Sequence, residues 1–481
     1  MTKMNINGIW LRLISMAMLF ITNGCTDFLN VNQDPNNPSS PEASKLLTGG
    51  QVNFVAALAE SYEPGAASYV QHILHGGWSS SFPDATIILA WDQLYSGSLI
   101  DLHNLINQQE RLRSYHYSGI SKILTAYIYS VLVDLFGTIP FSEALHGDDS
   151  NIFNPNYEEG ENIYTQLFEM IDSGLNDLSG ESQLTPDEDD LIYSGDINAW
   201  IKAGHSLKLK LYNQIRLVDP DLAKSEINNL IAGENLISNI DEGFTFHFGF
   251  SASPDNRHPL FEPNYNFKFP QMGDFLGRTL MGAKSDPRMP YYFYNQSNTF
   301  ISSSDGSVNS VYGIYPVGGL FDDGQAMHVD PEAANGAGFF PIITYSMVLF
   351  VQAEASLTLG TTGEPKLLLE QAIRASMEGV EYFSNIPMPV GAKESYINNL
   401  LDEFDNSLTV EEKLEIIMTE KYVSLFGNGI EAYNDVRRTG YPKFQSNFFP
   451  PRWKLPETEV RFNNNTPDDH DFTEPVFWDI N

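Results

Sequence analysis

The sequence contains little cysteine, little positive charge and few long apolar runs. One of its 481 residues is a cysteine, Cys25, so no intramolecular disulfide can form and packing alone must hold the fold. Lysine and arginine number 27 against 62 aspartates and glutamates. Nucleic acid is therefore excluded as a partner, because phosphate binding depends on basic side chains that displace counterions. The apolar run at 13–21 is too short for a membrane-spanning helix, which needs about 20 residues, and no other run reaches that length.

The first 24 residues have the features of a secretory signal peptide. Lys3 and Arg12 are positive, no acid occurs, and residues 13–21 are almost all apolar. Cys25 follows directly. A lone cysteine can also be a core residue or a free thiol, but this position predicts cleavage before Cys25 and lipid attachment to its thiol. Loss of Lys3 and Arg12 leaves 25 bases against 62 acids, a formal charge of −37. We therefore expect acyl chains, rather than charge, to attach the protein to a membrane.

Beyond the signal peptide, the sequence divides into a short tether and one long body. Residues 25–41 are rich in Asn, Pro and Ser, which is typical of an extended segment. Residues 42–481 are predicted to form a single all-α, or mainly α, body, because apolar residues recur every three or four positions in five segments. These predicted helices cover 118–136, 159–178, Trp200 to Ile215, Tyr345 to Leu359 and Glu411 to Phe426, the last with a capping box at Thr409 and Glu412 and a stop at Gly427.

Two regions lack any helical pattern and are candidates for binding. The stretch from about 232 to 340 is dominated by Gly, Pro, Asn, Ser and aromatic residues, and the segment 75–84 is similar. Aromatic rings in such loops can stack on the apolar faces of sugars or on peptide side chains, while polar groups bond the edges. Alternatively, each ring anchors its own loop to the core. The predicted ligand-binding residues are Trp78, Phe82, Tyr265, Phe267, Tyr312 and Tyr315.

The sequence carries no motif that predicts catalysis, a cofactor or a metal. No Gly-rich phosphate loop, zinc-protease helix or EF-hand loop is found. Gly204-His205-Ser206 lacks the closing glycine of a nucleophile elbow and lies within a helical pattern. His72 and His75 could share a helix face, but two histidines without a third ligand rarely bind a metal. With 62 carboxylates, a helical glycoside hydrolase with paired acids remains an alternative, because only geometry identifies such a pair.

Several short motifs occur in series along nearly the whole chain beyond residue 24. They are Cys25 to Leu29, Asn32 to Asn36, Asp134 to Gly137, Pro140 to Ala144, Gly195 to Trp200, Asp286 to Arg288, Ala353 to Ala355, Glu431 to Tyr433 and Arg437 to Pro442. Gly137 and Pro140 are expected to end a helix, and Arg437 and Arg438 to fix the last helix by hydrogen bonds to carboxylates or carbonyls. No single motif is specific, but in this order they resemble the SusD/RagB family of surface lipoproteins, in particular its SusD-like branch.

This resemblance implies tetratricopeptide-like helix pairs and a ligand site made of loops. It also implies a lipid-anchored protein of the outer membrane, exposed at the cell surface, whose partner is a SusC-like TonB-dependent barrel. The expected function is capture of an oligosaccharide, or of a peptide, and its delivery to that transporter without turnover. A protein that acts alone as a scavenger or adhesin is the other alternative.

Overall fold

The computed structural model describes residues 42–74, 84–267, 271–293, 313, 315–318, 335–444, 449–468 and 473–480, without the side chains at 148, 149 and 265–267. Within these residues the chain is mainly α-helical and its few strands pair only in twos, which confirms the predicted fold class. Cys25, in the predicted tether, lies outside the described residues.

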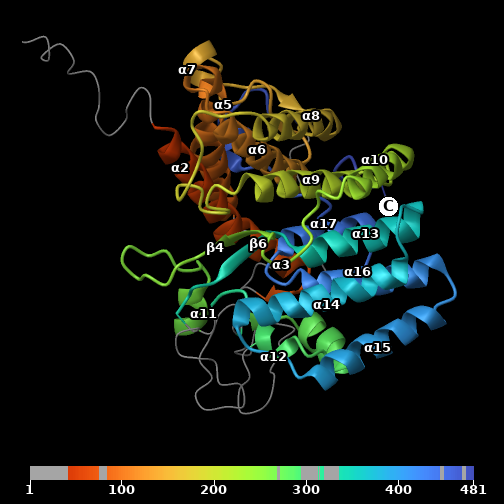
Figure 1. Ribbon diagram of the computed structural model, residues 1–481. Helices are drawn as coiled ribbons and strands as arrows, with labels where there is room; N and C mark the ends of the chain where they lie inside the picture. The colour runs from red at the N-terminus through yellow and green to blue at the C-terminus, as the bar shows by residue number, and fades with distance from the viewer. Residues whose placement is uncertain are drawn as a thin grey trace, which may run out of the picture.

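Most helices of the first half form the upper part of the molecule in Figure 1, and α3 lies near its middle. They are α2 (Ala43–Val55), η2 (Ala56–Tyr62), α3 (Glu63–Tyr69), α4 (Asp84–Asp92), η3 (Gln93–Leu99), α5 (Ile100–Leu112), α6 (Tyr115–Phe136), α7 (Gly147–Ser150), α8 (Gly160–Ser179), α9 (Ile197–Gln214) and α10 (Pro220–Ala232), where η denotes a π-helix.

The second half contains the lower helices and most of the short elements (Figure 1). Its helices are α11 (Phe261–Phe267), η4 (Phe275–Gly282), α12 (Met289–Tyr292), α13 (Tyr345–Leu359), α14 (Pro365–Ser384), α15 (Val390–Asn406), α16 (Val410–Ser424), α17 (Gly429–Thr439) and α18 (Glu457–Phe462).

Three antiparallel two-stranded sheets connect parts of the chain that are distant in sequence. The pairs are β1 (Ile73–Leu74) with β5 (Gln271–Met272), β2 (Ile139–Pro140) with β3 (Tyr157–Glu158), and β4 (Phe244–His247) with β6 (Phe339–Ile343). The region from 232 to 340, expected to be irregular, therefore contains short helices and strands, each too brief for its apolar period to be visible in the sequence.

The five predicted helices are α6, α8, α9, α13 and α16, and their ends agree to within about three residues. The capping box predicted for α16 is present: the Thr409 side chain accepts from the Glu412 backbone, and the Glu412 carboxylate accepts from the Thr409 backbone. Glycine permits the close approach of α6 and α8, because a Cβ at Gly119 would lie 2.8 Å from the carbonyl oxygen of Gly174. Long apolar stripes therefore predicted the main helices correctly.

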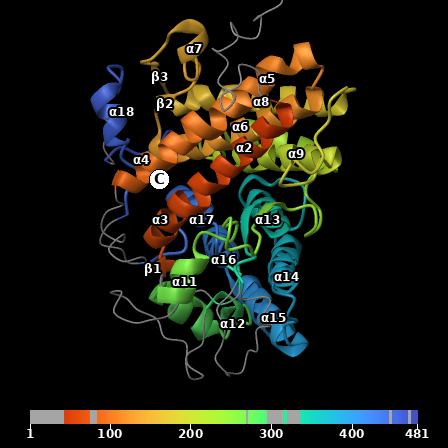
Figure 2. The same ribbon diagram turned by 90° about the vertical axis from the view of Figure 1, so that its left-hand side faces the viewer.

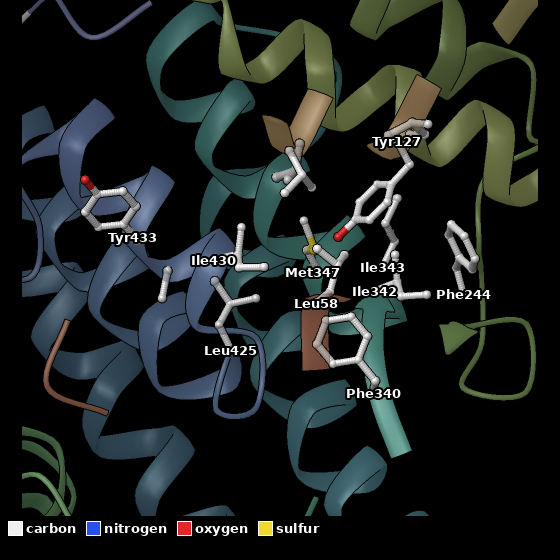
Figure 3. Close-up of a cluster of buried hydrophobic side chains, with 14 of the residues drawn as sticks. Leu58, Tyr127, Phe244, Phe340, Ile342, Ile343, Met347, Leu425, Ile430 and Tyr433 are labelled. Carbon is white, nitrogen blue, oxygen red and sulfur yellow. The ribbon is translucent and has the colours of Figure 1, made fainter. Parts of the chain in front are cut away.

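The core continues from the upper helices into the lower ones. Figure 3 shows Tyr127 of α6, Phe244 of β4, Met347 of α13 and Ile430 of α17 in one buried cluster. The rings of Tyr127 and Phe244 meet edge to face with centroids 6.0 Å apart, a favourable aromatic geometry. The two halves are thus joined by packing.

Among the described residues, α6 is the one helix long and apolar enough to cross a membrane. It is completely buried by the surrounding helices, so it is the central helix of a folded body.

Candidate functional site

The structure describes only part of the predicted ligand-binding set. Tyr265 and Phe267 lie on α11, but their side chains are outside the description. Trp78, Phe82 and Tyr312 lie outside the described residues altogether. The structure does describe the residues that flank these positions.

The N-terminal flank of 75–83 meets the C-terminal flank of 268–270 at the β1–β5 pair. Leu74, which precedes residue 75, is paired with Gln271, which follows residue 270. The strands approach closely because residue 273 is glycine: a Cβ at Gly273 would lie 2.0 Å from the carbonyl oxygen of Gln71. Two candidate regions almost 200 residues apart in sequence therefore begin from one small sheet.

The flanks of 319–334 meet at the start of α11. Gly318 and Gly336 touch through their backbones, since a Cβ at Gly318 would lie 2.7 Å from the carbonyl carbon of Gly336. The Gly336 carbonyl accepts a hydrogen bond of 2.9 Å from the His258 N–H, and a Cβ added at Gly336 would contact the Phe261 ring. The region 319–334 is thus joined to the same part of the fold as α11.

Residues 313 and 315 are hydrogen-bonded to α12. The Gly313 N–H donates to the Tyr292 carbonyl at 2.7 Å, and the Tyr315 N–H donates to the Tyr291 carbonyl at 2.9 Å. Figure 2 shows β1, α11 and α12 at one end of the molecule. We call the surface formed by β1, β5, α11, α12 and residues 313 and 315–318 the loop face.

The side chain of Tyr315 is buried, although it was expected to be available to a ligand. It is 6% exposed, its ring stacks on Tyr292 at 5.3 Å, and it meets Phe339 edge to face at 4.9 Å. Burial raises the pKa of its hydroxyl well above the ordinary value. In this arrangement a ligand could stack on the ring only by displacing its aromatic neighbours, so Tyr315 anchors its segment to the core.

Polar side chains beside α11 were not predicted from the sequence. The guanidinium of Arg257 binds both Asp255, at 2.8 Å, and Glu262, at 2.7 Å, and lies 5.3 Å from the Phe261 ring centroid. Hydrogen bonds from Arg257 lower the pKa of Asp255 to about 2. These groups can form hydrogen bonds with hydroxyl or amide groups of a ligand. They were not predicted because a short cluster of charged residues in a loop has no distinctive sequence pattern.

The base of β1 is fixed by hydrogen bonds to α16. His72 Nε2 lies 2.9 Å from the Tyr422 carbonyl oxygen, and the Tyr422 hydroxyl donates to the Val70 carbonyl at 2.7 Å. Burial lowers the pKa of His72 to about 3, so this imidazole is neutral near pH 7. His72 is therefore a structural residue, while His75 lies outside the described residues.

The sequence motifs around Asp134 and Arg437 meet in a buried polar cluster. Asp134 accepts hydrogen bonds from Tyr164, Asn434 and Trp478 at 2.5 to 3.0 Å. Arg437 donates to the Asp134 carbonyl at 2.6 Å, as expected for a residue that fixes the last helix. The cluster joins α6, α8, α17 and the C-terminal segment, which makes its role structural.

A second buried cluster joins α9, α13 and α17. Glu354 binds Arg438 through both carboxylate oxygens and Arg216 at 2.8 Å. Burial disfavours ionisation, but the two guanidinium groups outweigh it and hold the pKa of Glu354 below its ordinary value. Removing one partner would leave a buried charge uncompensated, so this cluster requires all its members.

Within the part of the chain that the structure describes, no group of three or more His, Cys, Asp or Glu side chains is arranged to hold a metal ion.

Solved structures with the same fold are SusD homologues. A chitin-binding SusD homologue from Flavobacterium johnsoniae is 20% identical with a TM-score of 0.72, and the match covers 90% of this chain and 99% of that one. A SusD homologue from Bacteroides fragilis is 18% identical with a TM-score of 0.72, and the match covers 91% and 99%. These values establish a SusD-like fold, mainly α with tetratricopeptide-like helix pairs.

Residues 35–454 match the SusD-like family model, whose description is "Starch-binding associating with outer membrane". The chain belongs to this SusD-like family, as its short motifs indicated. No match is found among the curated proteins.

Proposed function

We propose that this protein binds a glycan at the cell surface and delivers it to a SusC-like TonB-dependent transporter in the outer membrane. The observation that carries the proposal is that the N-terminal flank of 75–83, the flanks of 268–270 and the flanks of 319–334 converge on the loop face. Membership of a family described as starch-binding, and a chitin-binding homologue among the similar folds, favour a glycan over a peptide as the ligand.

The predicted binding mode combines stacking with hydrogen bonding. Trp78 and Phe82 are proposed to stack on sugar rings, with Tyr265, Phe267 and Tyr312 contributing. Arg257 and Glu262 are proposed to bond hydroxyl groups at the same face. A well-placed aromatic contact contributes about 0.5 to 1.5 kcal/mol beyond its buried area, so removal of one ring should weaken binding severalfold or more.

A binding screen with a variant at Trp78 tests this proposal. The chain from residue 25, with Cys25→Ala to prevent acylation, would be titrated with a panel of glycans and peptides by calorimetry. We expect a glycan to bind and Trp78→Ala to weaken that binding severalfold, with an unchanged circular dichroism spectrum. Phe462→Ala is a matched control, because Phe462 is 72% exposed on α18 and lies outside the loop face. Binding of peptides alone, or equal affinity of Trp78→Ala and wild type, would contradict the proposed ligand or site.

The protein is proposed to bind its ligand without turnover. Incubation of the protein with each glycan that binds should therefore release no shorter product. Product release that is abolished by a single carboxylate-to-amide substitution would instead establish a glycoside hydrolase with paired acids.

The anchor is proposed to be a lipid on Cys25. Metabolic labelling with a fatty-acid analogue should mark the wild-type protein and not Cys25→Ala, which should be released from the membrane fraction. Two acyl chains give stable anchoring where one is marginal. Equal labelling of the two proteins would refute the assignment.

The transporter partner is proposed because a protein tethered outside the membrane can concentrate a ligand but cannot move it across a bilayer. Extraction of the lipidated protein in mild detergent should recover a β-barrel protein with it. A stable pair should bury more than about 1,200 Å² in total. If no barrel protein is recovered, and loss of the neighbouring barrel gene leaves ligand uptake unchanged, the protein acts alone as a scavenger or adhesin.

A further inference from the structure

A pocket lies at the end of the molecule opposite the loop face. It opens between α5, α6 and α8, which Figures 1 and 2 both place away from α11 and α12. Its volume is about 430 Å³. Pockets that hold small molecules range from about 300 to 1,000 Å³. This pocket is therefore large enough for a small ligand and too small for a folded partner.

The floor of the pocket is a polar strip on an otherwise buried apolar helix. Lys122, Thr125 and Tyr129 of α6 line it, at spacings that place them on one helix face. A threonine within a helix usually faces water or bonds the carbonyl four residues back. Thr125 is 6% exposed, and its Oγ1 has no hydrogen-bond partner among the described residues. A buried hydroxyl without a hydrogen-bond partner lowers the stability of the folded protein unless a bound molecule supplies the partner.

The walls supply hydrogen-bonding groups of both kinds. Gln166 and Glu169 line the pocket from α8, and His103 lines it from α5. His146, in the segment after β2, closes one side with its ring 5.1 Å from that of His103. The amide and the imidazoles can each donate and accept, and the carboxylate accepts.

The pocket also has an apolar side that includes an aromatic pair. The rings of Tyr129 and Phe141 meet edge to face at 4.7 Å, and Met170 of α8 lies among the lining residues. A ligand that fits must therefore present an apolar face together with several polar edges. A purely apolar ligand would leave the polar lining unpaired.

The charges in the pocket disfavour an anion. The one ammonium group in the lining, on Lys122, is paired with Asp177 at 2.6 Å and bonds Ser173 at 3.0 Å. Glu169 adds a negative charge, and the chain as a whole carries −35. A neutral molecule with several hydroxyl groups and one apolar face fits both the polar lining and the apolar side, and a sugar ring is such a molecule.

We propose that this pocket is a second saccharide-binding site, for one or two neutral sugar units, formed by the helix pairs independently of the loop face. The ligand class rests on the proposed function, because a protein that gathers glycans is exposed to such molecules. The site would hold an end or branch of a glycan, or a short saccharide, separately from the main ligand.

Variants at the two sites separate this proposal from the proposed function. The unacylated chain would be mixed with neutral mono- and disaccharides, and binding would be followed by saturation-transfer NMR and by titration. Glu169→Gln removes the charge at an exposed position of α8 while keeping the shape, so the fold should persist. A hydrogen bond to a charged group contributes about 1.5 to 3 kcal/mol, which corresponds to a loss of about tenfold or more in affinity. Glu161→Gln, exposed in the first turn of α8, is the matched control and should have no effect.

The expected result is a saccharide whose binding falls about tenfold in Glu169→Gln and persists in Trp78→Ala. Saccharide binding that Trp78→Ala abolishes and Glu169→Gln leaves unchanged would overturn the second site while the proposed function stands. Saccharide binding that Glu169→Gln reduces, with no glycan affected by Trp78→Ala, would support the second site and overturn the main one. Binding of none of these neutral saccharides would also overturn the second site.

Discussion

Glu63 is a buried carboxylic acid whose ionisation should oppose folding. It lies at the start of α3 with 3% of its surface exposed, and its Oε1 accepts a long hydrogen bond of 3.4 Å from the Gly429 N–H at the start of α17. No ion pair of Glu63 is found within the described residues. Burial raises the pKa of Glu63 from 4.5 to about 7, although the Gly429 hydrogen bond acts in the opposite direction.

The raised pKa of Glu63 sets the sign and the size of the change in folding stability with pH. Below about pH 4.5 the carboxyl is protonated in both states, and the folded protein keeps its full stability. As the pH rises, the unfolded chain loses this proton first, so stability falls until the folded group has also ionised, above about pH 7. A pKa difference of about 2.5 at about 1.4 kcal/mol per unit gives a loss of about 3 kcal/mol.

The substitution Glu63→Gln should remove this loss. Urea unfolding of wild type and variant would be compared at about pH 5 and about pH 9, and the difference in their stabilities should shift by about 3 kcal/mol in favour of the variant at the higher pH. All other groups titrate in both proteins and cancel in the difference. The exposed Glu60, three residues earlier, provides the control Glu60→Gln, which should follow wild type. Parallel pH profiles of wild type and Glu63→Gln would refute the reasoning.

Glycine positions give the remaining predictions. Gly174→Val should destabilise the protein by about 1 to 3 kcal/mol, because its Cβ would lie 3.0 Å from the Gly119 carbonyl oxygen, and an unchanged melting temperature would contradict the packing of α6 on α8. Gly379→Ala, with no atom within 4 Å of the new Cβ, should instead stabilise α14 by about 0.5 to 1 kcal/mol in the same assay, and a fall in melting temperature would count against it. Gly273→Val should lower glycan affinity with little change in circular dichroism, since it disrupts the β1–β5 pair, and unchanged affinity would separate that sheet from binding.

The main helices were predictable because the sequence of each one contains local signals for a helix. The apolar stripe of α6 continues for most of its 22 residues, and Gly137 with Pro140 marks its end. The capping box at Thr409 and Glu412 is a purely local signal. Short elements such as β1 and β5 have only two residues each, and their pairing depends on a partner almost 200 residues away, which no local pattern encodes.

The sequence could propose a candidate site from its composition but could not place the side chains. Loop-like sequence indicated where aromatic residues gather, yet it could not tell a ring that faces outward from one that faces the core, and Tyr315 proved to face the core. The pocket opposite the loop face was not predicted, because its lining comes from α5, α6, α8 and the segment after β2. In the sequence, Lys122, Thr125 and Tyr129 indicate only that they share a helix face. Whether they line a pocket depends on the residues that α8 places opposite them.

The distribution of charge between interior and surface bears on how the protein meets a partner. Among the described residues, nine lysines and arginines are buried against eight aspartates and glutamates. Buried charges require opposite partners, so the interior uses the two signs almost equally although acids outnumber bases in the chain. With 27 bases in all, no more than 18 remain for the surface, which therefore carries the whole negative excess.

This surface charge limits the chemistry of any partner that sits close to it. Two strongly acidic surfaces would repel, and at physiological salt this repulsion is largely screened only beyond a Debye length of about 8 Å. A transporter that forms a stable pair with this protein must then offer basic residues or bound cations where they meet, and the recovered pair should dissociate more readily as salt rises. A pair that tightens with salt would place the contact on apolar surface instead, because salt screening would then remove only a repulsion.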